Sequence, residues 1–135
     1  MSATPDSCIH LTIDDVKEIH DLVIAEFGGS RGVRDEGLLH SAVAAAQATV
    51  GGESPFADLT EVAAAYLFYL CRNHSFIDGN KRTAMTVAIV FLRLNSVGVV
   101  PDSDKWEALI LDVAASRVDR DAATQRLKAL VARKR

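Results

Sequence analysis

Two apolar segments, EVAAAYLFYLC (residues 61–71) and AMTVAIVFL (84–92), constrain the fold of this chain more than any other feature. A helix that is apolar on nearly every face is buried all round, as the middle helices of a bundle are. Each segment has about ten residues, roughly half of what a bilayer-spanning helix needs. We therefore expect two central helices inside a soluble protein, and no membrane association.

The remaining sequence predicts helices almost throughout. The expected helices span about 11–27, 36–50, 58 or 60 to 73, 80–95, 103 onwards after Pro101, and roughly 119–133. Runs of β-branched residues with a period of two are almost absent, so a sheet is not expected. The prediction is an all-α fold, a compact bundle of about six helices in one domain covering residues 1–135. Residues 50–59 are the one non-helical stretch long enough for a short hairpin or flap.

Capping residues support several of these helix starts. Thr12 and Asp15 have the spacing of a capping box. Asp35 can cap the second helix, and Ser103 is a plausible cap for the fifth.

Composition and charge narrow the class of protein. Nearly half of the residues are apolar (49%) and 24% are charged, which is typical of a soluble globular domain. The two cysteines, Cys8 and Cys71, suggest no disulfide framework, and the N-terminus has no secretion signal, so we expect a cytoplasmic protein. A net charge of −3 argues against direct nucleic-acid binding. Seven of the 15 Lys and Arg residues lie in 117–135. This cluster is typical of a solvated terminal helix, and a docking surface for an acidic partner is the alternative interpretation.

The nonapeptide HSFIDGNKR, residues 74–82, joins the two apolar segments. Phe76 and Ile77 can anchor this junction in the core, and Gly79 permits a backbone conformation or a close approach that other residues do not. Lys81 and Arg82 fall in the first turn of the next helix, where the dipole disfavours cations. An anion bound there would compensate, and phosphate is the natural candidate.

The other polar residues of the nonapeptide complete a chemical site. A carboxylate beside bound phosphates, as Asp78 would be, is a typical ligand for Mg²⁺. Histidine is the side chain best suited to accept a proton near neutral pH, so His74 fits a general base. Alone, each residue is more often a cap, a turn or solvated surface, but the ordered combination suggests phosphoryl or nucleotidyl transfer from a nucleoside triphosphate to a hydroxyl. His10, His20 and His40 lack such neighbours and are interpreted as structural or exposed.

The nonapeptide resembles the signature of the Fic/Doc superfamily, H-x-F-x-(D/E)-G-N-(G/K)-R, at every defined position. Lysine in the eighth position is similar to the Doc (death-on-curing) branch of toxins, as is the upstream stretch GGSRGVRDEGLLHSAV (28–43). The resemblance implies a small all-α fold.

The resemblance also implies roles for the residues of the motif. His74 would be the catalytic base, Asp78 the Mg²⁺ ligand and Phe76 the buried anchor of the loop. The phosphate would be bound by the backbone N–H groups and the cationic side chains of four residues, Gly79, Asn80, Lys81 and Arg82.

Two departures from the Fic branch bear on the reaction. AMP-transferring Fic enzymes have glycine at the position of Lys81 and a second arginine at the position of Met85. The resemblance to the Doc branch instead implies transfer of the γ-phosphate of ATP to a threonine of elongation factor Tu. We therefore prefer the hypothesis of a kinase to that of an AMP transferase.

The resemblance further implies a Phd-like antitoxin whose C-terminal segment folds onto the toxin. The inhibitory pattern (S/T)-x-x-x-E-(G/N) is absent from the chain, because Gly32 stands four residues before Glu36-Gly37. Two alternatives to the kinase remain: a nucleotidyl transferase, and a helical interaction module without catalytic activity.

Overall fold

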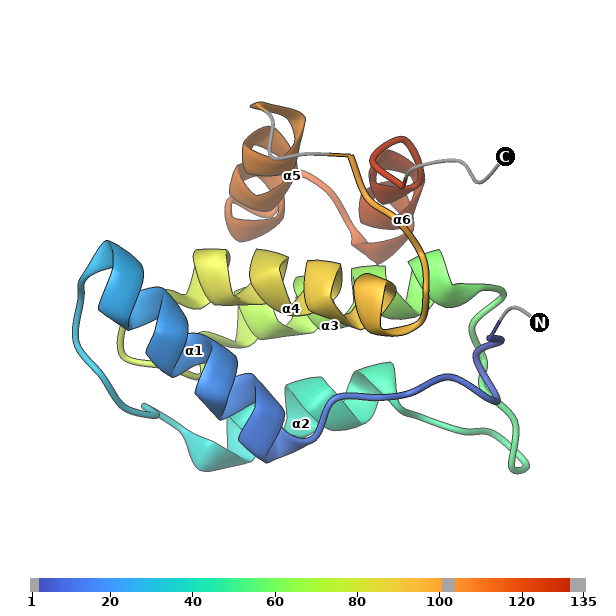
Figure 1. Ribbon diagram of the computed structural model, residues 1–135, viewed down its shortest axis with the longest axis horizontal. Coiled ribbons are helices and arrows are strands. Elements are labelled where there is room, and N and C mark those ends of the chain that lie inside the picture. Colours follow the sequence, from blue (N-terminus) through green and yellow to red (C-terminus); the bar gives the residue numbers. More distant parts are fainter. Residues whose placement is uncertain (1–2, 101–103, 132–135) are drawn as a thin grey trace.

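The computed structural model describes residues 3–100 and 104–131 of the chain (Figure 1). Within these ranges six helices follow one another: α1 Ile13–Phe27, α2 Glu36–Ala46, α3 Leu59–Asn73, α4 Asn80–Leu94, α5 Asp104–Ala114 and α6 Arg120–Lys128. The described residues contain no strand, only three isolated β-bridges. The predicted all-α bundle of six helices is confirmed.

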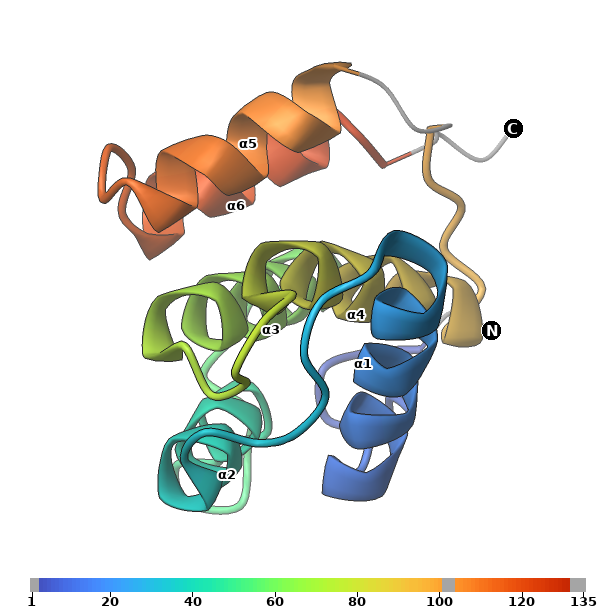
Figure 2. The same cartoon turned by 90° about the vertical axis from the view of Figure 1, so that its left-hand side faces the viewer.

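The helices form three layers. Figure 2 shows α3 and α4 in the middle, with α5 and α6 on one side and α1 and α2 on the other. The largest fully buried side chains include Tyr66 of α3, Phe91 of α4 and Trp106 of α5. The prediction that the two apolar segments form central helices is therefore confirmed.

The caps predicted for the first two helices are present, and the third helix begins after Asp58, one of its two expected starts. Thr12 and Asp15 form the capping box of α1, with hydrogen bonds in both directions. The carboxylate of Asp35 accepts the backbone N–H of Leu38, and Asp58 caps α3 in the same way. Pro101 and Ser103 lie outside the described residues.

Two helices end earlier than the sequence patterns predict. The expected extension of α2 to residue 50 is wrong, because the helix ends at Ala46 and Gln47 turns its side-chain amide to the carbonyl of Leu11 (2.6 Å). Val50 and Glu53 then form a tight antiparallel bridge. Similarly, α6 ends at Lys128 rather than near residue 133. The backbone after it turns to pair with residues 99 and 100, which satisfies backbone groups outside any helix.

The course of the chain decides which loops lie near the nonapeptide. The tight bridge at residues 50–53 precedes the start of α3, whereas the nonapeptide follows its end, so the 15 residues of that helix separate them. The connection between α1 and α2 instead runs beside the nonapeptide (Figure 2). No helix in the described parts of the chain has the length and apolar character needed to cross a membrane.

Candidate active site

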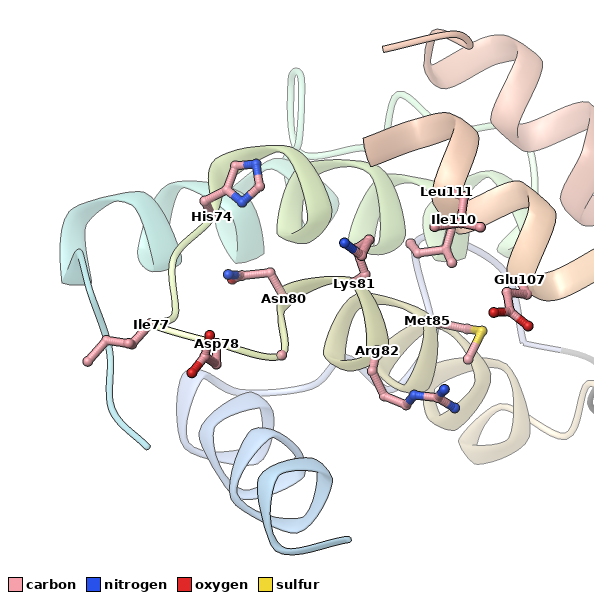
Figure 3. A pocket seen from close by; sticks show the side chains of 11 residues that line it. His74, Ile77, Asp78, Asn80, Lys81, Arg82, Met85, Glu107, Ile110 and Leu111 are labelled. Atoms are coloured by element: carbon pink, nitrogen blue, oxygen red, sulfur yellow. The ribbon is translucent and has the colours of Figure 1, made fainter. Parts of the chain in front are cut away.

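His74 ends α3 in a left-handed backbone conformation, with φ 49° and ψ 49°. Such a conformation costs a residue other than glycine about 1 kcal/mol or more, so surrounding contacts must hold it. The guanidinium of Arg34 supplies them by donating to the carbonyl of His74 at 2.7 Å and to that of Asn73 at 3.2 Å. The imidazole itself is exposed and lines a cavity (Figure 3).

A segment between α1 and α2, residues 29–35, braces the nonapeptide along its length; we call it the brace. The backbone N–H groups of Arg34 and Asp35 both donate to the carbonyl of Ser75. The N–H of Ile77 donates to the carbonyl of Gly32 at 3.1 Å. These bonds give the loop a fixed path although it belongs to no helix.

Phe76 anchors the loop in the core, as the sequence predicted. Its side chain is 2% exposed, and its ring stacks on the imidazole of His20 with centroids 3.9 Å apart. Nε2 of His20 lies 2.8 Å from the carbonyl oxygen of Asp78, so that nitrogen carries the proton and donates. His20 therefore fixes both the apolar anchor and the backbone just before α4.

Asn80 holds the loop to the start of α4. Its side-chain oxygen accepts the N–H of Phe76 and its nitrogen donates to the carbonyl of the same residue, both at 2.9 Å. These two bonds use the side-chain oxygen and one of the two amide hydrogens, so the backbone N–H and the second amide hydrogen of Asn80 are left to contribute to an anion site.

The start of α4 differs from the other helix starts that the structure describes with caps. Side chains of Thr12, Asp35, Asp58 and Asp119 cap α1, α2, α3 and α6. Helix α4 instead has Gly79 as its N-cap residue, with φ 77° and no side-chain cap. The positive φ favours glycine, and a Cβ at that position would also lie 3.1 Å from Cδ1 of Ile24. The first N–H groups of α4 are thus left for a ligand.

The charge of the first turn of α4 is also reversed. The first turns of the other five helices contain acidic residues, whereas that of α4 contains none and carries Lys81 and Arg82. Lys81 is exposed and forms no ion pair with any described residue. The guanidinium of Arg82 lies 4.0 Å from the ring centroid of Phe27. Two cations and unpaired N–H groups at one helix start fit a phosphate-sized anion.

Asp78 fits the coordination of a single Mg²⁺ ion together with substrate phosphates. Its Oδ2 accepts the N–H of Ser30 at 2.7 Å, which orients the carboxylate, and its Oδ1 has no partner among the described residues. No group of three or more His, Cys, Asp or Glu side chains converges in residues 3–100 or 104–131. A site with one carboxylate suits Mg²⁺, which keeps several waters and is often bound through one or two carboxylates plus phosphates.

These groups open into one cavity of about 390 Å³, which suits a small-molecule ligand. The cavity brings together all the predicted site residues except Phe76, which lies beneath the loop. Its far wall comes from α4 and α5. The sequence gives no site role to Glu107, Ile110 and Leu111, which form this wall with Met85, the position compared with the second arginine of the Fic branch (Figure 3).

One predicted anchor of the loop is wrong, and two supports of the loop are not indicated by the nonapeptide itself. Ile77 is 52% exposed and lines the cavity instead of entering the core. His20 is 1% exposed, which confirms the structural place expected for it, and its bond to the loop is a contact that the sequence does not predict. Arg34 lies in the GGSRGVRD stretch, so the resemblance upstream of the nonapeptide was the available signal.

Comparison with known proteins finds a matching family model and similar relatives. A family model described as the Fic/DOC family matches residues 10–92. Toxin Doc of Mycolicibacterium smegmatis is 44% identical over 108 residues, which cover 78% of this chain and 83% of that protein. Protein kinase doc of Escherichia phage P1 is 35% identical over 121 residues, covering 90% of this chain and 94% of that protein.

Proposed function

This chain belongs to the Fic/Doc family, and from that premise we propose that it is a Doc-type toxin that phosphorylates a protein hydroxyl with ATP. The observation that carries the proposal is the uncapped, cationic start of α4, which shares one cavity with His74 and Asp78. That cavity offers a phosphate site, a metal ligand and a base together. The similar protein named Protein kinase doc supports phosphoryl transfer.

In the proposed reaction the acceptor oxygen attacks the γ-phosphorus of ATP. The bond from that phosphorus to the β–γ bridging oxygen breaks, ADP leaves, and the proton of the hydroxyl passes to the imidazole of His74. Lys81, Arg82 and the N–H groups of α4 hold the phosphate oxygens, and Asp78 holds Mg²⁺. The ion, when bound, neutralises part of the charge on the phosphates.

Phosphate transfer is favoured over AMP transfer by Lys81 and Met85. The Lys81 ammonium lies in the anion site, where AMP-transferring relatives of the family have a glycine without a side chain. Met85 is 8% exposed and offers a thioether to the cavity, where a second arginine would hold another phosphate. This arrangement supports a single main phosphate position at the start of α4.

The target and the inhibitor are further parts of the proposal. By resemblance to the Doc branch, the acceptor is a threonine of elongation factor Tu, so that phosphorylation in the cytoplasm arrests translation and growth. The chain lacks the inhibitory pattern within residues 1–135, which supports restraint by a separate Phd-like antitoxin. The similar protein named Toxin Doc supports a toxin of this kind.

A labelling experiment tests the transfer. Purified protein is incubated with Mg²⁺, a bacterial extract containing elongation factor Tu, and ATP labelled at either the α- or the γ-phosphate, with His74→Ala as the blank. Label transferred only from the γ-position, and only when His74 is present, is the expected result. Label from the α-position would establish nucleotidyl transfer instead, and no label from either would favour a non-catalytic module.

A further inference from the structure

The cavity has a second end that the proposed chemistry does not use. Glu107, Ile110 and Leu111 of α5 stand at positions i, i+3 and i+4, so they share one helix face. This face and Met85 line the end of the cavity that lies away from His74 and Asp78 (Figure 3). Two layers of the bundle therefore enclose one site.

The chemistry of this second end differs from that of the first. Ile110 is 5% exposed and supplies an apolar wall together with Met85, while Leu111 remains 46% exposed at the cavity. Glu107 is exposed and has no hydrogen bond or ion pair with a described residue. By contrast, Asp112 on the same helix is bonded to Arg117 and Arg126.

The two ends together can orient a nucleotide. A triphosphate is attracted to the cations and N–H groups at the start of α4 and repelled by the carboxylate of Glu107. The uncharged part of the nucleotide is therefore directed toward α5. Apolar side chains there can pack against a flat base, and a carboxylate can only accept hydrogen bonds, which sugar hydroxyls donate.

We propose that α5 forms the nucleoside subsite of this protein, in which Glu107 binds the ribose hydroxyls and Met85, Ile110 and Leu111 pack against the base. The proposal rests on the proposed function, because it requires a nucleoside triphosphate in the cavity. An acidic side chain that accepts from a ribose 2′-hydroxyl is a known solution in nucleotide-binding folds. Glu107 then makes the site specific for ribonucleotides.

The test compares the affinities of the full-length protein for ATP, 2′-deoxy-ATP and inorganic tripolyphosphate, measured by calorimetry with Mg²⁺. Wild-type protein should prefer ATP over 2′-deoxy-ATP by about tenfold, the order expected for a hydrogen bond to a charged group. Glu107→Gln should reduce this preference, because a neutral amide oxygen is a weaker acceptor than a carboxylate. The same variant should bind tripolyphosphate at least as well as the wild type does, because it removes a charge that repels phosphate. Leu111→Ser should weaken ATP binding without affecting tripolyphosphate.

Asp104→Asn is the matched control, because it removes one negative charge from the same first turn of α5 outside the cavity lining. It should keep the preference for ATP. Equal affinities of wild-type protein for ATP and 2′-deoxy-ATP would overturn the proposal. So would a Glu107→Gln variant that loses ATP and tripolyphosphate alike, since Glu107 would then act through the fold.

The two proposals fail differently. Wild-type protein that binds tripolyphosphate and ATP equally well has a phosphate site but no nucleoside subsite, and only the present inference falls. Protein that binds none of the three compounds contradicts the proposed function itself, and the subsite with it.

Discussion

Two polar clusters contact the central helix α3. In one of them mainly the backbone is hydrogen-bonded, whereas in the other the side chains are hydrogen-bonded to each other. One is the nonapeptide loop at the end of α3. The other lies beside Tyr66 in the middle of the helix and includes His10, Gln47 and Cys8; we call it the Tyr66 network. Both contain a histidine and several other polar groups.

The Tyr66 network satisfies its own side chains. The hydroxyl of Tyr66 accepts from Gln47 Nε2 at 3.1 Å and from the N–H of Leu11 at 3.2 Å. Its own hydrogen is therefore directed to Nδ1 of His10, 2.8 Å away, which leaves the histidine proton on Nε2, 3.5 Å from Sγ of Cys8. Burial raises the pKa of Tyr66 to about 12 and lowers the pKa of His10.

The loop uses mainly its backbone for structure. The carbonyls of His74, Ser75 and Asp78 are all taken by the brace or by His20. The imidazole of His74 and the ammonium of Lys81 have no polar partner among the described residues and line the cavity. The Tyr66 network therefore stabilises the fold. The nonapeptide loop has a fixed backbone and leaves polar side chains available to a ligand.

Replacing His74 tests the loop side of this contrast and should have the largest effect. We expect His74→Asn to lower phosphoryl transfer by about 10²- to 10⁴-fold, because the general base is lost. Asparagine tolerates the left-handed backbone, so the free energy of unfolding should change by about 0.5 kcal/mol or less. Transfer is measured with labelled ATP and stability by urea unfolding. Transfer near the wild-type rate would remove His74 from the chemistry.

Tyr66→Phe tests the closed network and should reverse the pattern. Removing the hydroxyl leaves its buried hydrogen-bond partners unsatisfied, so the free energy of unfolding should fall by about 1–3 kcal/mol. The rate of transfer at saturating ATP should stay near that of the wild type, provided that the assay temperature is well below the midpoint of unfolding. A large loss of rate in a folded variant would show that the two clusters are coupled.

Arg34→Lys would sharpen the contrast, because it alters the support of His74 and leaves its side chain intact. Lysine cannot reproduce the two-pronged donation to the carbonyls of Asn73 and His74. We expect kcat to fall about tenfold through misplacement of the base, with little change in KM for ATP. Arg31→Lys, in the same brace but with no side-chain bond to a described residue, should behave as the wild type does.

The pH dependence of stability should show a smaller effect from His10. Its pKa is lowered from 6.5 in the folded protein, so the unfolded chain takes up the proton first as the pH falls. The free energy of unfolding that His10 contributes is therefore present above pH 6.5 and lost below it. Urea unfolding at neutral and mildly acidic pH should show a steeper loss for wild-type protein than for His10→Gln. Equal slopes would contradict the assignment of a neutral His10.

Local patterns predicted the elements better than their ends. The capping box at Thr12 and the aspartate caps at positions 35 and 58 depend on a few neighbouring residues, so α1, α2 and α3 start where the sequence indicates. The early end of α2 depends on Gln47 reaching Leu11 and Tyr66, which are distant in sequence. No local pattern contains that contact.

The same limit applies to the candidate site. The residues of the nonapeptide that line the cavity could be named because they are contiguous in sequence. The contacts that complete the site come from distant parts of the sequence. Arg34 is 40 residues from His74, and His20, whose ring stacks on Phe76, is still further away. The wall formed by α5 belongs to a separate helix. The prediction that Ile77 enters the core is wrong for a related reason, because an apolar residue in a loop can face either the core or a cavity.

The brace also bears on when the site can form during folding. Its bonds to the loop join residues separated by 40 positions (Arg34 and His74) and 48 positions (Ser30 and Asp78), and the bond from His20 to Asp78 spans 58. Closing such long loops costs chain entropy that other native contacts must offset, so we expect these bonds to form late in folding. A partly folded chain with intact α3 and α4 would thus lack a positioned His74, so the onset of catalysis during refolding should report the completed native state rather than an intermediate.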